Sequence, residues 1–494
     1  MLVKVLMMIL FFVSVVVVGV VCRKKATDVN GFVLGGRNVG PWLTAFAYGT
    51  SYFSAVIFVG YAGQFGWKFG IASTWIGIGN AVIGSLLAWL ILGKKTRNMT
   101  HKLDSKTMPD FFESRFNSKS LKLGASLLIF VFLIPYTASL YNGLSRLFEM
   151  AFGIDYIVCI FAMAIFTAIY VIVGGYFATA VNDFIQGIIM LVGIVVVIAA
   201  VLNINGGLMG SIDALANIKG DAETVGEYAS VFGPLPIDLF GVVILTSLGT
   251  WGLPQMVQKF YAIKSEDAIK KGTIISTLFA VVVAGGCYFL GGFGRLFMTS
   301  EEVANNGYDS VVPTMLQNLP DVLIGIVIIL VLSASMSTLS SLVLTSSSTL
   351  TLDFINGTIV KNMSEKGKGL CLRVFVFIFI LISATIAIIQ YSSKVNFIAQ
   401  LMGISWGALA GSFLAPFLYS LYWKKTTKDA CWTSFITGSG LMIANMIFGK
   451  SFPVIIASPI NCGAFAMLVG LVIVPIVSLC TKKPSDDVIA KAFD

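Results

Sequence analysis

Long apolar runs recur along the whole chain and are separated by short polar connections. Each run holds about 20 mainly apolar residues, which is the length a helix needs to cross the hydrocarbon core of a bilayer. The pattern predicts an all-α polytopic membrane protein. We expect about 13 transmembrane helices, at residues 3–22, 42–62, 70–93, 123–150, 155–174, 183–203, 236–258, 272–294, 320–352, 370–390, 396–421, 430–448 and 461–480.

The charged residues are sorted between the loops on the two sides of these predicted helices. Loops on one side, among them the connection that begins at Lys259, hold 26 of the 33 Lys and Arg residues, and the other side holds six. An excess of basic residues marks cytoplasmic loops. We therefore expect a plasma (cell inner) membrane protein with its N-terminus outside and its C-terminus in the cytoplasm. The net charge of +9 then reports topology and does not indicate nucleic-acid binding.

Composition narrows the class further. The chain is 57% hydrophobic and 12% charged, with a mean hydropathy of +0.91, and its longest polar stretches are too short for a separate soluble domain. The seven Cys are scattered without zinc or disulfide spacing, and the single His101 lies in a charged loop. We expect no enzyme active site, and no appended signalling domain that a sensor would need.

Two predicted helices have unusual centres. Residues 42–63 read WLTAFAYGTSYFSAVIFVGYAG, with small and hydroxyl residues in the middle, and residues 241–260 read GVVILTSLGTWGLPQMVQKF. In the second, Pro254 removes a backbone donor and clashes with the preceding turn, next to Gly249 and Gly252. Both helices are candidates for a break near mid-membrane. The alternative is that the glycines serve packing and the proline is a kink.

The two candidate breaks lie at equivalent places in two blocks of five spans. The blocks, 42–203 and 236–421, would have opposite orientations because five is odd. This is the pattern of an inverted-repeat transporter whose broken helices bind ion and solute. The remaining parts are an extra helix and loop at 1–41, an outer loop at 204–235, and two helices with a short tail at 422–494.

A run of hydroxyl residues, SASMSTLSSLVLTSSSTLTLD, follows the apolar half of span 320–352. Ser337, Ser340 and Ser341 share one helix face, and Thr338 flanks it. A dehydrated Na⁺ needs several hard oxygen ligands, which hydroxyls and open carbonyls supply. The alternative is that the hydroxyls bond their own i−4 carbonyls and ease packing. Asp183 is a second candidate, either functional as an intramembrane acid or placed at a helix N-terminus by the dipole.

Three stretches resemble the signatures of the sodium:solute symporter family: FVLGGRNVGPW (32–42), GGYFATAVNDFIQGIIM (174–190) and SMSTLSS (335–341). The resemblance covers roughly residues 30–425. It implies the leucine-transporter-type 5+5 inverted repeat with flanking helices, and alternating access driven by Na⁺ as the coupling ion.

The resemblance also implies site residues. By position, the common sodium site falls on the carbonyls of Thr50, Phe53 and Ala334 and the hydroxyls of Ser337 and Thr338. Some members hold a second ion on an acid and two more hydroxyls. Asp183, Ser340 and Ser341 match those positions, together with Ser337, which leaves a second Na⁺ open. Arg37, in the LGGR motif, is expected to belong to the cytoplasmic gate.

Solute contacts carried over in the same way number seven: Tyr52, Ser54, Ile57, Tyr136, Thr246, Thr250 and Trp251. Tyr136 and Trp251 could equally be packing residues. Sodium/proline carriers have an acid at the position of Tyr52 and Trp-Thr-Asp at 181–183, where this chain has Val-Asn-Asp. The NDFIQG and GLP stretches are closer to the pantothenate carrier.

The sequence therefore predicts Na⁺-coupled symport of a small organic solute, carried by a membrane protein expected to act as a monomer. A carboxylate-bearing solute is favoured: a proline-like amino acid, pantothenate or a monocarboxylate. Alternatives are a sugar or sialic acid symporter, a proton-coupled symporter that uses Asp183, and, in a different class, an ion channel or uncoupled uniporter.

Overall fold

The computed structural model describes residues 2–23, 28–219, 224–356, 358–360, 363–392 and 398–493. Among these residues the secondary structure is helical, with isolated β-bridges in place of strands. Eleven helical stretches of the described part are long and apolar enough to cross a membrane. The expected all-α polytopic class is confirmed at this level. The expected start of span 396–421 and residues 220–223 of the outer loop lie outside the described residues.

The helices have the following bounds: α1 (Leu2–Cys22), α2 (Val29–Leu34), α3 (Pro41–Tyr52), α4 (Ala62–Phe69), α5 (Thr74–Gly79), α6 (Lys94–Lys102), α7 (Met108–Phe116), α8 (Lys119–Phe152), α9 (Tyr156–Ile204), α10 (Gly207–Ala216), α11 (Pro236–Leu248), α12 (Pro254–Ala262), α13 (Glu266–Gly291), α14 (Ser300–Asn306), α15 (Val311–Leu316), α16 (Asp321–Ser348), α17 (Glu365–Ser392), α18 (Ile398–Tyr422), α19 (Lys428–Phe448), α20 (Val454–Ala457), α21 (Pro459–Cys480) and α22 (Asp486–Phe493). Short 3₁₀ or π-helical segments adjoin several of them: η2 (Gly35–Arg37), η3 (Val56–Tyr61), η5 (Asn80–Leu87), η6 (Trp89–Gly93), η8 (Gly249–Trp251), η10 (Tyr308–Ser310) and η11 (Thr349–Ile355).

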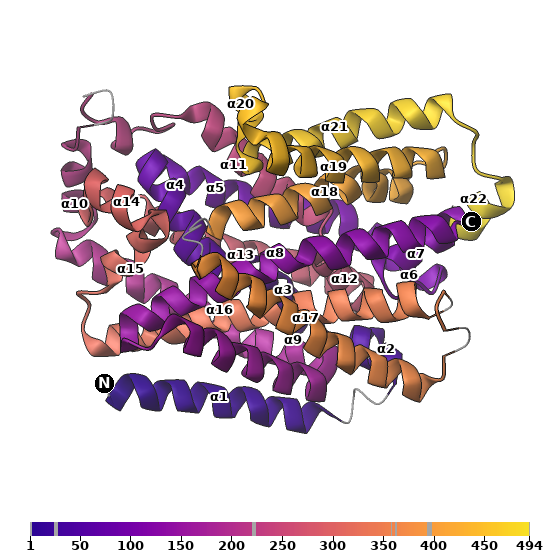
Figure 1. Cartoon of the computed structure of the whole chain (residues 1–494), viewed down its shortest axis with the longest axis horizontal. Coiled ribbons are helices and arrows are strands. Elements are labelled where there is room, and N and C mark those ends of the chain that lie inside the picture. Colours follow the sequence, from indigo (N-terminus) through magenta and orange to yellow (C-terminus); the bar gives the residue numbers. More distant parts are fainter. Residues whose placement is uncertain are drawn as a thin grey trace.

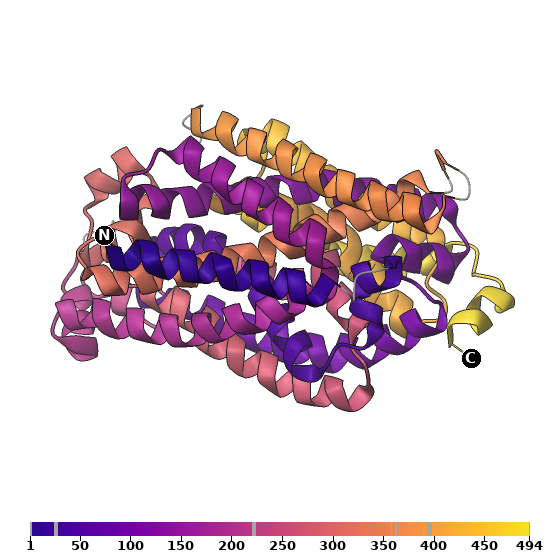
Figure 2. The ribbon, with the colours of Figure 1, turned by 90° about the horizontal axis from the view of Figure 1, so that it is seen from below.

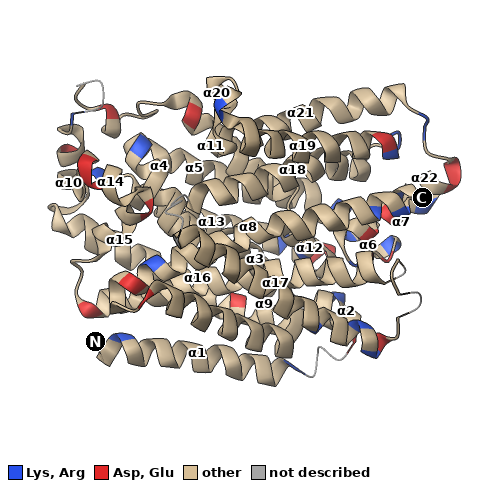
Figure 3. Cartoon of the chain, viewed as in Figure 1, with Lys and Arg blue, Asp and Glu red and all other residues tan. Residues whose placement is uncertain are grey.

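The long helices run roughly along the longest axis of the molecule, and the two termini lie at opposite ends (Figure 1). The view turned by 90° shows the same alignment (Figure 2). Charged residues gather at the two ends, most of all around α2, α6, α7 and α22, whereas the middle is nearly free of them (Figure 3). This distribution fits a protein whose central band lies in lipid.

The helix boundaries agree with the expected spans at two informative points. The expected spans 155–174 and 183–203 both lie in the 49-residue element α9, in which the non-helical backbone of Gly175 (φ 58°, ψ −164°) separates two helices. Only glycine adopts this backbone conformation without strain. Likewise, the helical stretch Val56–Lys102 is interrupted at Gly70 (φ 61°, ψ −142°), where the expected span 70–93 begins. The count of 13 spans and the division into two five-helix repeats stay predictions.

Helix α16 lies at the centre of the molecule. It packs against α9, α8, α1, α17 and α3. Every residue from Leu330 to Ser348 is buried, including the whole expected hydroxyl run in this helix. The hydroxyls therefore face protein and not lipid.

Candidate functional site

The first expected helix break is present. Helix α3 ends at Tyr52, Phe53 has an extended backbone (φ −102°, ψ 117°), and the π-helix η3 starts at Val56. At the break, the backbone N–H of Ala55 leaves the helix pattern and donates to Ser335 Oγ of α16 at 3.1 Å. The break thus joins α3 directly to the hydroxyl face of α16.

The groups expected to hold sodium meet at this junction. Thr338 Oγ1 lies 3.0 Å from the carbonyl oxygen of Ala334 and 3.2 Å from that of Thr50. Ser337 Oγ donates to Thr50 Oγ1 at 2.7 Å. Phe53 occupies the extended position of the break itself. The structure therefore gathers a cluster of uncharged, hard oxygen atoms of the kind that suits an alkali cation.

One helical turn further along α16 the surroundings are charged. Asp183 of α9 is fully buried, and neither carboxylate oxygen has a hydrogen-bond partner. The Ser337 hydroxyl lies next to this carboxylate but donates to Thr50. Ser340 Oγ donates to the Ser337 carbonyl at 2.8 Å, and Ser341 Oγ shares a hydrogen bond of 2.7 Å with Ser51 Oγ. The three residues expected to hold a second ion are therefore near one another.

Lys259 was missed as a site residue. The expectation that it starts a cytoplasmic loop is wrong, because it lies inside α12 and is only 3% exposed. Its Nζ donates to Ser341 Oγ at 2.9 Å and lies 5.2 Å from the centre of the Tyr176 ring. Polar residues at 255, 258 and 259, directly after Pro254, were the available sequence signal for a continuing helix with a polar face.

The second expected break is also present. Helix α11 ends at Leu248, a 3₁₀ turn covers Gly249–Trp251, and Leu253 is extended (φ −80°, ψ 121°) before Pro254 starts α12. A Cβ on Gly252 would come within 2.7 Å of the backbone of α18. Glycine at this position allows the interrupted segment to touch α18 closely.

The expected solute residues fall into two groups joined by one side chain. In the first group, Tyr52 Oη donates to the Thr246 carbonyl, and Thr250 Oγ1 donates to the Gly84 carbonyl at 3.0 Å. Trp251 Nε1 donates to the Ile83 carbonyl at 3.0 Å. These contacts place η5 against both broken helices.

The second group lies around Trp406 of α18, which was also missed. Trp406 stacks on Tyr52, with ring centroids 5.8 Å apart, and meets Tyr136 edge-on at 5.9 Å. Tyr136 Oη and Trp406 Nε1 are buried without a hydrogen-bond partner, and Ser54 is the other polar neighbour of Tyr136. No periodic signal marks Trp406, because its role comes from packing between distant helices.

The remaining expected contact, Ile57, is fully buried in η3. Of the seven expected solute residues, none is more than 6% exposed. The region formed by these seven residues is therefore closed to solvent in this conformation.

Arg37 lies at the end of the molecule that carries α6 and α7. It donates to the carbonyls of Thr100 (3.2 Å) and Ser105 (2.9 Å) and pairs with Asp104 at 3.2 Å. Burial lowers the pKa of the guanidinium below its ordinary value, and the Asp104 carboxylate opposes that shift. Nearby, Val39 exchanges backbone hydrogen bonds with Ala262 and Lys264, both 3.1 Å long. Together these contacts hold the start of α3 against the end of α12 and close this end of the molecule.

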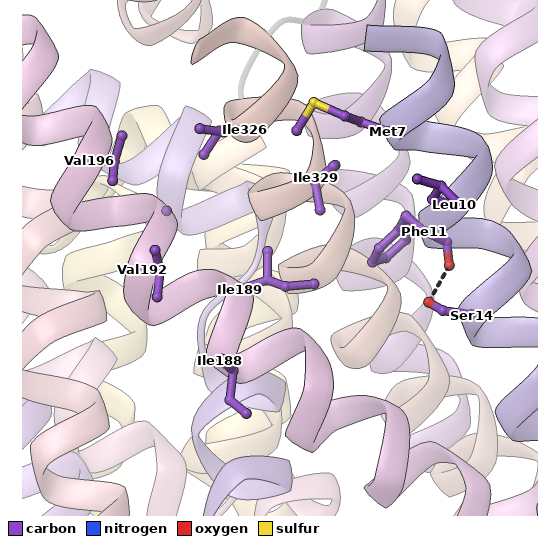
Figure 4. Close-up of a pocket in the computed structure, with 11 residues that line it drawn as sticks. Met7, Leu10, Phe11, Ser14, Ile188, Ile189, Val192, Val196, Ile326 and Ile329 are labelled. Carbon is purple, nitrogen blue, oxygen red and sulfur yellow. Dashed lines mark hydrogen bonds between the residues drawn. The ribbon is translucent and has the colours of Figure 1, made fainter. Parts of the chain in front are cut away.

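An apolar cavity of about 510 Å³ lies elsewhere, between α1, α9 and α16 (Figure 4). Its lining side chains, such as Leu10, Val192 and Ile329, are apolar, and Ser14 bonds the Phe11 carbonyl of its own helix. The cavity does not include any of the expected site residues. We therefore assign the chemistry to the buried junction of α3, α12 and α16.

Comparison with known proteins identifies the family of the chain. The model of the sodium:solute symporter family matches residues 32–438. The chain belongs to this family. It is 30% identical to the sodium/proline symporter of Staphylococcus aureus (strain JH9), over 97% of this chain and 93% of that protein. Membership of this family identifies the chain as a Na⁺-coupled solute symporter of the membrane. It is a transporter and not an enzyme.

Solved structures support the fold. A Na⁺-coupled sialic acid symporter in a substrate-bound, outward-open state superposes with a TM-score of 0.75 at 15% identity, covering 98% of this chain and 99% of that one. The inward-facing conformation of Mhp1 superposes with a TM-score of 0.51 at 11% identity, covering 92% of this chain and 94% of that one. At these identities the likeness describes the fold alone.

Proposed function

We propose that this symporter couples the entry of Na⁺ to that of a small, carboxylate-bearing solute by alternating access. Proline-like amino acids, pantothenate and monocarboxylates are the candidate solutes. The architecture proposed for it is 13 spans with two inverted five-helix repeats, 42–203 and 236–421, and a cytoplasmic C-terminus. Arg37 and its partners then close the cytoplasmic end.

The observation that carries the proposal is the meeting of α16 with the break in α3. Sodium would be held by the carbonyls of Thr50, Phe53 and Ala334 and by the hydroxyls of Ser337 and Thr338. Loss of sodium would weaken the contact between α3 and α16, because the same oxygens form the polar bridge at Thr50. Bound sodium would thus preform the solute site, which lies directly beyond the break at Tyr52 and Ser54.

The choice of a carboxylate rests on unused hydrogen-bond donors. Tyr136 Oη and Trp406 Nε1 are buried without acceptors, and a buried donor left unpaired costs free energy. A carboxylate offers two acceptor oxygens to such donors. No acid is among the residues proposed to contact solute, so nothing there would pair with a lone ammonium group.

Uptake of radiolabelled solutes into proteoliposomes that contain the full chain tests this function. A Na⁺ gradient would be supplied with proline, pantothenate, lactate, a short-chain fatty acid, sialic acid and glucose in turn. We expect Na⁺-dependent uptake of one carboxylate solute. Na⁺-dependent uptake of glucose alone would contradict the carboxylate assignment. Uptake driven by a proton gradient without Na⁺ would contradict sodium coupling, and solute flux without any ion gradient would indicate a uniporter.

A further inference from the structure

Lys259 is a cation buried in the middle of the proposed transport machinery. Its side chain does not reach solvent, since the residue is 3% exposed, and its Nζ donates to Ser341 Oγ at 2.9 Å. Burying an ammonium in a membrane protein is expensive unless a counter-charge or hydrogen bonds compensate it. The contact with the Tyr176 ring contributes only part of that compensation.

Asp183 supplies the counter-charge. It is fully buried, and Lys259 is the charged group that attracts it most strongly. Both carboxylate oxygens lack hydrogen-bond partners, so the positive charge of Lys259 is the main compensation for the negative charge of Asp183.

Ser341 connects this pair to the moving parts. It bonds Ser51 at the end of α3 at 2.7 Å as well as Lys259 on α12. A single hydroxyl of α16 therefore joins both broken helices. A mobile cation placed between Asp183 and Ser341 would meet the Lys259 ammonium at the same oxygen atom, and two like charges would repel each other.

We propose that Lys259 is a built-in cation that takes the place of a second sodium ion at the position formed by Asp183, Ser340 and Ser341. The inference rests on the proposed sodium-coupled function. It assigns one Na⁺ to each transport cycle, bound at the Thr50–Thr338 junction. It also makes Lys259 the residue that sets the number of coupling ions.

The test is equilibrium binding of radioactive ²²Na⁺ to the full chain in lipid nanodiscs without solute. The wild-type protein is expected to bind one Na⁺ per chain. Lys259→Met keeps the length and apolar stem of the side chain and removes its charge. This variant is expected to bind two. Lys259→Arg keeps the charge and is expected to bind one.

Two further variants make the result decisive. Lys68→Met removes a partly buried charge of α4 and is expected to leave one sodium bound. Lys259→Met with Asp183→Asn removes both charges, which protects the fold if the single variant fails to fold, and is also expected to bind one. Two sodium ions on the wild-type protein, or one on folded Lys259→Met, would overturn the inference. No specific sodium binding by the wild-type protein would overturn the proposed function as well.

Discussion

Two neighbouring positions on α16 differ in how they balance charge. At Thr338 the surrounding groups are carbonyls and hydroxyls without a formal charge. One turn on, a buried ammonium donates to Ser341, and a buried carboxylate attracts that ammonium. The neutral position gains a cation only when one enters from solution, whereas the charged position already contains one. Under the proposed function, a single hydroxyl-rich helix would hold a mobile ion and a fixed ion side by side.

The magnitude of like-charge repulsion supports the distinction. Two unit charges 5 Å apart at an effective dielectric constant of 20 interact by about 3 kcal/mol. This is about a hundredfold in binding affinity. A sodium ion beside Lys259 would therefore bind far more weakly than one at the neutral position.

The largest expected effect on stability comes from removing the Asp183 charge. Asp183→Asn leaves the Lys259 ammonium buried without its counter-charge, which costs about 3–5 kcal/mol. We expect a clear loss of thermal stability in nanodiscs. Adding Lys259→Met should restore most of the lost thermal stability, because both changes act on the attraction between Asp183 and Lys259. If Asp183→Asn lowers thermal stability equally in the wild-type and Lys259→Met proteins, the charges of Asp183 and Lys259 do not compensate each other.

Asp309 of η10 offers a control for the Asp183 variant. It is also a buried acid, but it lies far from α12 along the chain. Burial raises its pKa to about 6. The folded state therefore holds its proton more tightly than the unfolded state, and this contribution to stability is lost as pH rises from about 4 to about 6. Asp309→Asn should remove that pH dependence and leave sodium binding unchanged.

A smaller effect is expected at Ser337, which lies between the two positions. Its hydroxyl donates to Thr50 Oγ1 and neighbours Asp183. Ser337→Ala removes one proposed sodium ligand, so the Na⁺ concentration for half-maximal uptake should rise about tenfold, in line with the loss of a hydrogen-bond partner to a charged group. Unchanged sodium dependence with a weakened Asp183–Lys259 coupling would assign Ser337 to the charged position instead.

Trp406→Phe should weaken solute binding and leave both cation positions unchanged. It keeps the stacking on Tyr52 but removes the Nε1 donor. We expect the KM for a carboxylate solute to rise several-fold, corresponding to about 1 kcal/mol for one hydrogen bond. Half-maximal sodium should stay unchanged, and a rise in sodium requirement without a change in KM would contradict the assignment of Trp406 to the solute.

The smallest effect is expected at Arg37. Arg37→Gln removes an ion pair with an exposed carboxylate, worth about 0.2–1 kcal/mol, together with contacts to two carbonyls. Hydrogen exchange in the α6–α7 connection should become faster, while the number of bound sodium ions stays the same. Slower exchange, or a changed sodium count, would contradict its assignment as a contact that only closes this end.

The sequence was sufficient for the parts of the site that depend on local chemistry. Proline at 254 and the small and hydroxyl residues at 49–54 predicted both breaks, because each weakens the backbone pattern of its own helix. The spacing of hydroxyls from 333 to 341 predicted the polar face of α16. The apolar pattern predicted two spans within the range of α9, and Gly175 separates two helices there.

The rest depended on tertiary packing. Lys259 was assigned to a loop because a charge near the end of an apolar run ordinarily reaches the interface. Its burial depends on Ser341 and Asp183, which lie about 80 residues away on either side. Trp406 belongs to the site through ring contacts with Tyr52 and Tyr136. The polar residues at 255, 258 and 259 indicate a polar helix face, but the local sequence does not identify the distant partners of Lys259 or of Trp406.

The central claim is that sodium binds where Thr338 meets the break in α3. The most direct measurement compares Na⁺-dependent solute uptake by Thr338→Val with that by Ser347→Ala. Ser347 is a buried hydroxyl of the same helix that bonds the Leu344 carbonyl of its own turn. We predict that Thr338→Val raises half-maximal sodium at least tenfold and that Ser347→Ala leaves it unchanged. Equal sodium dependence in the two variants would contradict the account.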